Sequence, residues 1–148
     1  MTTLRAEIEI NAPKKLVWQA LTVKENWIYW NTFLFDCDPD QPLAGGKEIF
    51  LAFSRLPREE QTEFEARITF LQPEVCLKWV SSIPGLTNEY VFELQEIGVR
   101  RTQYVHQNRF YGMLKPIFFP FIRDDELLGI KRMAKELKRY VETADERR

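Results

Sequence analysis

The sequence predicts an α+β fold in which an antiparallel sheet packs against one long C-terminal helix. In several segments before residue 111, apolar and polar side chains alternate with the period of two that is typical of half-buried strands. Over residues 120–142 the apolar period changes to about 3.6, the period of an amphipathic helix. The chain has 148 residues and no internal repeat or linker, so we expect a single domain over residues 1–148.

The N-terminal region predicts one strand followed by two short helices. Residues 4–10 alternate apolar with charged side chains, which indicates a strand. Pro13 suits the first turn of a helix, and the apolar residues of 16–21 fall on one helical face. We expect the second short helix at residues 27–30, before a turn-rich loop at 36–46.

The middle of the chain predicts an antiparallel meander. Proline and glycine turns interrupt the alternating segments, and such breakers mark the ends of strands. We expect four or five strands, at 47–53, 61–71, 75–81, 87–96 and 100–110.

Composition excludes several classes of protein. Lys and Arg total 21 against 22 for Asp and Glu, so the net charge of -1 provides no basic field for a nucleic acid. The apolar stretch 113–122 contains a lysine and two prolines and is too short to span a bilayer. The N-terminus has no apolar core of a secretory signal. We therefore expect a cytoplasmic protein with no integral membrane segment and no nucleic-acid partner.

Aromatic side chains make up 14% of the residues, and alternation places seven of them on the inward face of the sheet. Apolar walls with a few convergent polar groups are typical of small-molecule cavities. The alternative is a filled core in which the polar groups bond one another. Alternation also predicts inward side chains at Ala66, Phe70, Val75 and Leu94. The candidate cavity residues are Phe64, Ile68, Leu77, Trp79, Tyr90, Phe92, Tyr104, His106, Asn108, Phe110, Ile130 and Met133.

His106 is the only histidine and therefore the one candidate catalytic residue. If it acts, proton transfer to or from a bound carbonyl compound is the expected chemistry, with Tyr104 or Asn108 orienting. A hydrogen-bonded core histidine is the more frequent case for a lone inward residue. No metal site is expected, because Gln41 occupies the glycine position of an EF-hand-like loop and the two cysteines lie far apart.

The segment 110–122 is unusually apolar for a junction between a strand and a helix. Its rings at Phe118, Phe119 and Phe121 are predicted to form the mouth of a cavity. The alternatives are a transient contact with a membrane surface, a dimer interface, or plain packing of the helix N-terminus. The oligomeric state, monomer or homodimer, stays open.

Four motifs resemble the START-like (SRPBCC) superfamily, and most closely its polyketide cyclase/dehydrase and lipid transport branch. The resemblance implies a helix-grip fold: a curved seven-stranded antiparallel sheet around a long C-terminal helix, with two short helices after the first strand and an internal apolar cavity. A common His-x-Glu-x-Phe pattern of the branch reads His106-Gln-Asn108-Arg-Phe110 here, which puts an acid-base pair at these positions in doubt. The motifs are Ile8-x-Ile10-x-Ala12-Pro13-x-x-x-Val17-Trp18-x-x-Leu21, Trp30-Asn31-x-Phe33, Pro84-Gly85-Leu86 and Thr102-x-x-x-His106-x-x-x-Phe110-x-Gly112.

The resemblance and the inward face together predict a binding or transport protein for a hydrophobic small molecule that is lipid-, polyketide- or isoprenoid-like. One alternative is a cyclase or dehydratase acting in the same cavity, and another is a protein-interaction module. No cofactor is expected.

Overall fold

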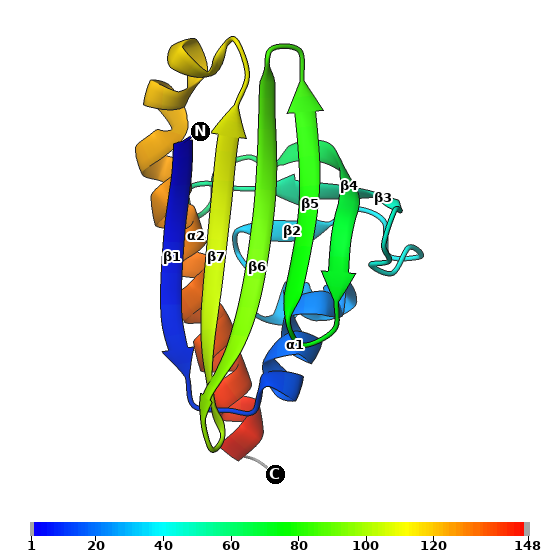
Figure 1. The fold of residues 1–148 in the computed structure, drawn as a ribbon, viewed down its shortest axis with the longest axis vertical. Coiled ribbons are helices and arrows are strands. Elements are labelled where there is room, and N and C mark those ends of the chain that lie inside the picture. Colours follow the sequence, from blue (N-terminus) through cyan, green and yellow to red (C-terminus); the bar gives the residue numbers. More distant parts are fainter. Residues whose placement is uncertain (1, 147–148) are drawn as a thin grey trace.

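The computed structural model describes residues 2–146 as one antiparallel sheet wrapped against a long helix (Figure 1). Residues 1, 147 and 148 of the predicted domain lie outside the described residues. The seven strands are ordered β1-β7-β6-β5-β4-β3-β2. The elements are β1 (Thr2–Ile10), α1 (Lys14–Thr22), the 3-10 helix η1 (Lys24–Tyr29), β2 (Leu34–Asp36), β3 (Glu48–Phe53), β4 (Thr62–Gln72), β5 (Cys76–Ile83), β6 (Leu86–Gly98), β7 (Arg101–Tyr111) and α2 (Lys115–Glu146).

The predicted fold class is confirmed, with three differences at the level of elements. The short helix η1 spans Lys24–Tyr29, whereas residues 27–30 were predicted. The strand β2 was not predicted, because three residues are too few to show alternation. The helix α2 begins at Lys115, five residues before the predicted start at Pro120. Pro116 lies in the first turn, where backbone N–H groups have no helical partner, and Pro120 removes only one hydrogen bond further along. Within residues 2–146, no helix is both long and apolar enough to cross a bilayer.

A β-bulge in β4 reverses the predicted direction of one side chain. The register with β5 shifts between Ile68 and Phe70, so Thr69 is an extra residue and the alternation changes parity. Phe70 is therefore 44% exposed, and the prediction that it faces inward is wrong. Val75 is 40% exposed, also against prediction, because it belongs to the turn before β5.

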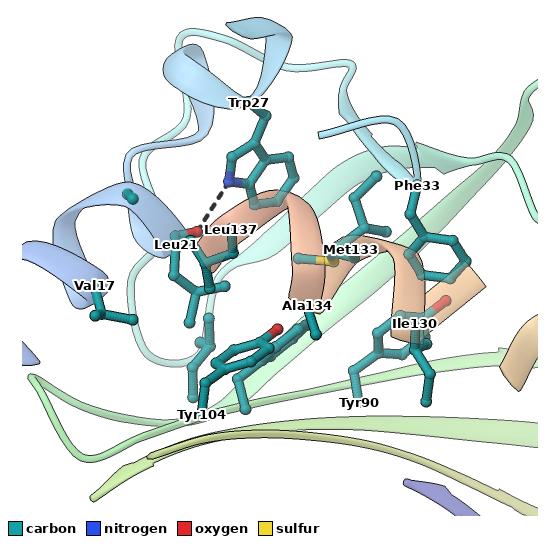
Figure 2. Close-up of a cluster of buried hydrophobic side chains, with 14 of the residues drawn as sticks. Val17, Leu21, Trp27, Phe33, Tyr90, Tyr104, Ile130, Met133, Ala134 and Leu137 are labelled. Carbon is teal, nitrogen blue, oxygen red and sulfur yellow. Dashed lines mark hydrogen bonds between the residues drawn. The ribbon is translucent and has the colours of Figure 1, made fainter. Parts of the chain in front are cut away.

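The core lies between the sheet, α2 and the α1–η1 segment (Figure 2). In Figure 2, Tyr90 and Tyr104 project from the strands, and Trp27 of η1 lies on the opposite side of the cluster. The indole Nε1 of Trp27 donates to the carbonyl oxygen of Leu21 over 2.9 Å, which ties η1 to α1. The buried inward stripe of α2 consists of Ile130, Met133, Ala134, Leu137 and Val141.

Close approach of Phe33 to α2 requires glycine at position 129. A Cβ atom built on Gly129 would lie 2.6 Å from Cε1 of the fully buried Phe33. We expect Gly129→Ala to lower the free energy of unfolding, because overpacking costs about 1–3 kcal/mol and exceeds the gain of up to about 1 kcal/mol from helix propensity. Urea denaturation measures the difference. Gly45→Ala is the control, since nothing lies within 4 Å of its Cβ position; equal stability of Gly129→Ala and wild type would contradict the packing.

Candidate functional site

Four side chains at alternate positions of β7 point into the core. Tyr104, His106, Asn108 and Phe110 are all 0–1% exposed. Because successive residues of a strand point to opposite faces, the three polar members are stacked along one line beneath α2. These three side chains therefore place a row of polar groups inside an otherwise apolar core.

A chain of hydrogen bonds connects this line to the surface. His106 Nε2 lies 2.9 Å from Asn108 Oδ1, and the amide Nδ2 of Asn108 donates to Glu126 Oε2 over 2.8 Å. The other oxygen, Oε1, accepts from Arg55 Nε over 2.8 Å. At the inner end, the hydroxyl of Tyr104 lies 3.5 Å from His106 Nδ1. We call these five residues the buried relay.

The carboxylate of Glu126 fixes the direction of every bond in the relay. An ionised carboxylate only accepts, so Asn108 must turn its NH₂ group toward Glu126 and its Oδ1 toward His106. His106 must therefore carry its proton on Nε2, which leaves Nδ1 free to accept from Tyr104. All the donors point toward Glu126.

Burial controls the protonation of the relay. Desolvation lowers the pKa of His106 to about 3, although the hydrogen bond that His106 donates to Asn108 acts in the opposite direction, so the imidazole is neutral near pH 7. Desolvation raises the pKa of Glu126, against the influence of Arg55 and Asn108. The pKa of Tyr90 is also raised, first by burial and then by the charge of Glu126. A histidine with so low a pKa is a weak general base at neutral pH.

Aromatic rings pack closely around the relay, and we call these rings the aromatic wall. The His106 ring lies 4.4 Å from that of Phe92, and Trp79 lies 4.9 Å from Phe92 and 5.2 Å from Tyr90, between ring centroids. Four buried side-chain polar atoms lack a hydrogen-bond partner among the described residues, and two of them belong to the sheet: the indole Nε1 of Trp79 and Oδ1 of Asn88. Buried polar atoms are rarely left unpaired. These two atoms lie on neighbouring strands, Trp79 on β5 and Asn88 on β6.

The structure brings together most of the residues predicted to line a cavity. Eleven of the twelve are buried, and Phe64 is half-buried with its ring stacked 5.9 Å from Tyr90. Most of their polar atoms bond one another, as in the filled-core alternative. Of the three mouth residues, Phe119 packs 5.3 Å from Phe110. Phe118 and Phe121 are 39% and 83% exposed and do not join the interior.

Two members of the relay were not predicted from sequence. Glu126 lies four residues before Ile130, on the inward stripe of α2, so a carboxylate at a core position of the helix was the signal. Arg55 follows β3 in a loop that carries no periodic pattern. No group of His, Cys, Asp and Glu side chains within the described residues could hold a metal ion. Asp36, the last residue of β2 and the first acidic residue of the EF-hand-like segment, instead pairs with the buried Lys24 over 2.6 Å.

The sequence matches no family model and no curated protein. Solved structures do match. A START superfamily protein from Mycobacterium smegmatis shares 13% identity over 96% of this chain and 98% of its own, with a TM-score of 0.73. The chain has the START-like, helix-grip fold. It also resembles BexL, a di-domain ARO/CYC protein from the BE-7585A biosynthetic pathway. The two share 14% sequence identity with a TM-score of 0.74, and the match covers 98% of this chain and 48% of BexL.

DynU16, a protein of the dynemicin biosynthetic locus, is a third similar structure. It shares 18% identity over 96% of this chain and 48% of its own, with a TM-score of 0.71. This chain therefore spans about half the length of both BexL and DynU16. At such identities the likeness concerns the fold, and function has to be argued from the site.

Substitution of Glu126 tests the relay directly. In Glu126→Gln, one oxygen becomes an NH₂ group that faces the Arg55 or Asn108 donor, so we expect a loss of about 1–3 kcal/mol in the free energy of unfolding. Chemical denaturation measures it. Asp124→Asn is the matched control on the exposed surface of α2, with an expected change within about 0.5 kcal/mol. Equal stabilities of Glu126→Gln and wild type would refute the relay.

The low pKa of His106 predicts a loss of stability in acid. Between its ordinary pKa of 6.5 and about 3, the unfolded chain binds a proton that the folded protein does not. Wild type should therefore lose up to about 1.4 kcal/mol of stability per pH unit as the pH falls through this window, relative to His106→Gln. Denaturation curves of both proteins from pH 7 to pH 4 measure the difference. Parallel pH profiles would show that His106 is not held neutral by burial.

Proposed function

We propose that this protein binds a hydrophobic small molecule that carries one polar group, in the interior between the sheet and α2. The START-like fold supports a ligand of this class, since START superfamily and ARO/CYC proteins share its architecture. The observation that carries the proposal is the pair of unpartnered buried atoms, Trp79 Nε1 and Asn88 Oδ1, beside a wall of aromatic rings.

The two atoms differ in chemistry, and this defines the polar group of the ligand. Trp79 Nε1 only donates and Asn88 Oδ1 only accepts, so a hydroxyl group, which does both, satisfies either atom. A ligand carbonyl satisfies Trp79 alone. In the relay, His106 Nε2 already donates to Asn108 Oδ1, and Asn108 Nδ2 already donates to Glu126 Oε2. The relay therefore contributes to binding by fixing the orientation of its own Tyr104 and His106 rings, which form part of the aromatic wall.

Entry is expected past Phe53 and Phe64. These rings are half-buried and lie 5.7 Å apart at the edge of the aromatic cluster, while Trp79, Tyr90 and Phe92 behind them are fully buried. Their displacement opens a path to Trp79. This path adjoins the outer end of the relay, because Cζ of Arg55 lies 4.4 Å from the centroid of the Phe53 ring. Phe118 and Phe121, the predicted mouth residues, are more exposed and are left as a surface for contact with a membrane or another protein.

Native mass spectrometry of the protein purified without added ligand tests the proposal. We expect a stoichiometric apolar passenger that is released on denaturation and that carries a hydroxyl or carbonyl group. A folded protein that holds no passenger, and that also fails to enhance the fluorescence of the neutral probe N-phenylnaphthylamine, would contradict the proposal.

The substitution Trp79→Phe distinguishes a hydrogen bond between Trp79 Nε1 and the ligand from purely apolar contact. It keeps an aromatic ring in the wall but removes the Nε1 donor, so the protein should hold less passenger, because the loss of one buried hydrogen bond lowers the affinity by up to about tenfold. Trp18→Phe on α1 is the matched control and should hold the wild-type amount. Equal occupancy of Trp79→Phe and wild type would show that Trp79 Nε1 does not bind the ligand.

A further inference from the structure

A groove of about 740 Å³ lies outside the interior, between the outer face of α2 and the end of η1. None of the twelve predicted cavity residues lines it. Its volume falls in the range of about 300–1,000 Å³ that is usual for small-molecule sites. Its lining, which we call the α2 groove, consists of Tyr29, Trp30, Leu128, Lys131, Arg132, Lys135, Glu136, Arg139, Tyr140, Thr143 and Ala144.

The α2 groove is basic in a chain that is acidic overall. Four cationic side chains and one carboxylate, Glu136, line it, whereas the whole chain has a net charge of -1. Two of these charges already have partners: Arg132 donates to the carbonyl oxygens of Ser54 and Arg55, and Glu136 accepts from Thr32. These bonds hold one wall of the groove to the loops beside it.

Three cations of the α2 groove remain without partners. Lys131, Lys135 and Arg139 form no ion pair or hydrogen bond with any of the described residues. They are spaced four residues apart, so they lie above one another on one face of α2. A row of unpaired cations along one edge favours an anion in the groove.

The floor of the α2 groove is aromatic. The rings of Trp30 and Tyr140 stack with centroids 6.2 Å apart and an angle of 24° between planes. Tyr29 is 73% exposed beside them. Trp30 Nε1 is buried without a partner among the described residues, so a donor lies beneath this floor as well. Flat apolar groups pack well on such rings.

We propose that the α2 groove binds an amphipathic organic anion, with a flat apolar body on Tyr29, Trp30 and Tyr140 and an acidic group at Lys131, Lys135 and Arg139. The proposal does not depend on a ligand in the interior, because the two sites share no residue. The groove has the volume of a small-molecule site, and the net charge of -1 provides no extended basic field for a nucleic acid.

The fluorescent probe anilinonaphthalene sulfonate, a flat aromatic anion, tests the site in a fluorescence titration at low ionic strength. We expect the triple variant Lys131→Gln/Lys135→Gln/Arg139→Gln to bind it about tenfold more weakly than wild type, because three exposed cations are lost. The neutral probe N-phenylnaphthylamine should bind both proteins equally. Tyr29→Ala should also lower the affinity for the anionic probe, since the aromatic floor loses its exposed ring.

The matched control is Lys14→Gln/Lys15→Gln/Lys47→Gln, which removes the same charge from positions outside the groove. It should bind the anionic probe like wild type, and circular dichroism should show that all variants remain folded. Unchanged affinity in the groove variant, an equal loss in the control, or an equal loss for the neutral probe would each overturn the proposal. Absence of an interior passenger would leave these expectations unaltered.

Discussion

The buried carboxylate of Glu126 is the constraint on which the interior depends. It lies on α2, accepts from Asn108 of β7 and from Arg55 after β3, and so joins three separated parts of the chain at one point. Removing a carboxylate from water is costly, and the cost is offset only when charged and polar partners surround it. Because it accepts and never donates, it also fixes the amide of Asn108 and, through it, the tautomer of His106.

Much of the fold follows from local patterns. Alternation located the five strands from β3 to β7 and placed Tyr104, His106 and Asn108 on one buried face. It failed at Phe70, because a bulge changes parity without a clear sequence signal, and at β2, which is too short to alternate. The early start of α2 at Lys115 was missed because prolines normally end helices, although the first turn tolerates them.

The relay was only half predictable, since its two halves depend on different kinds of information. Tyr104, His106 and Asn108 are neighbours on a single strand, so their common face follows from spacing. Their contact with Glu126 depends on how α2 is rotated and shifted over β7, which is a property of the packed protein. The two sides of α2 then differ in chemistry: one carboxylate in an apolar stripe faces the sheet, while Lys131, Lys135 and Arg139 form a row along the outer groove.

The state of His106 is the most direct test of this account, because the chain has no other histidine. A long-range proton–nitrogen correlation spectrum of the labelled protein at neutral pH distinguishes the two tautomers. We expect a neutral imidazole with its proton on Nε2 and no titration between pH 8 and pH 5. A proton on Nδ1, or titration near the ordinary pKa of 6.5, would show that Glu126 does not order the interior.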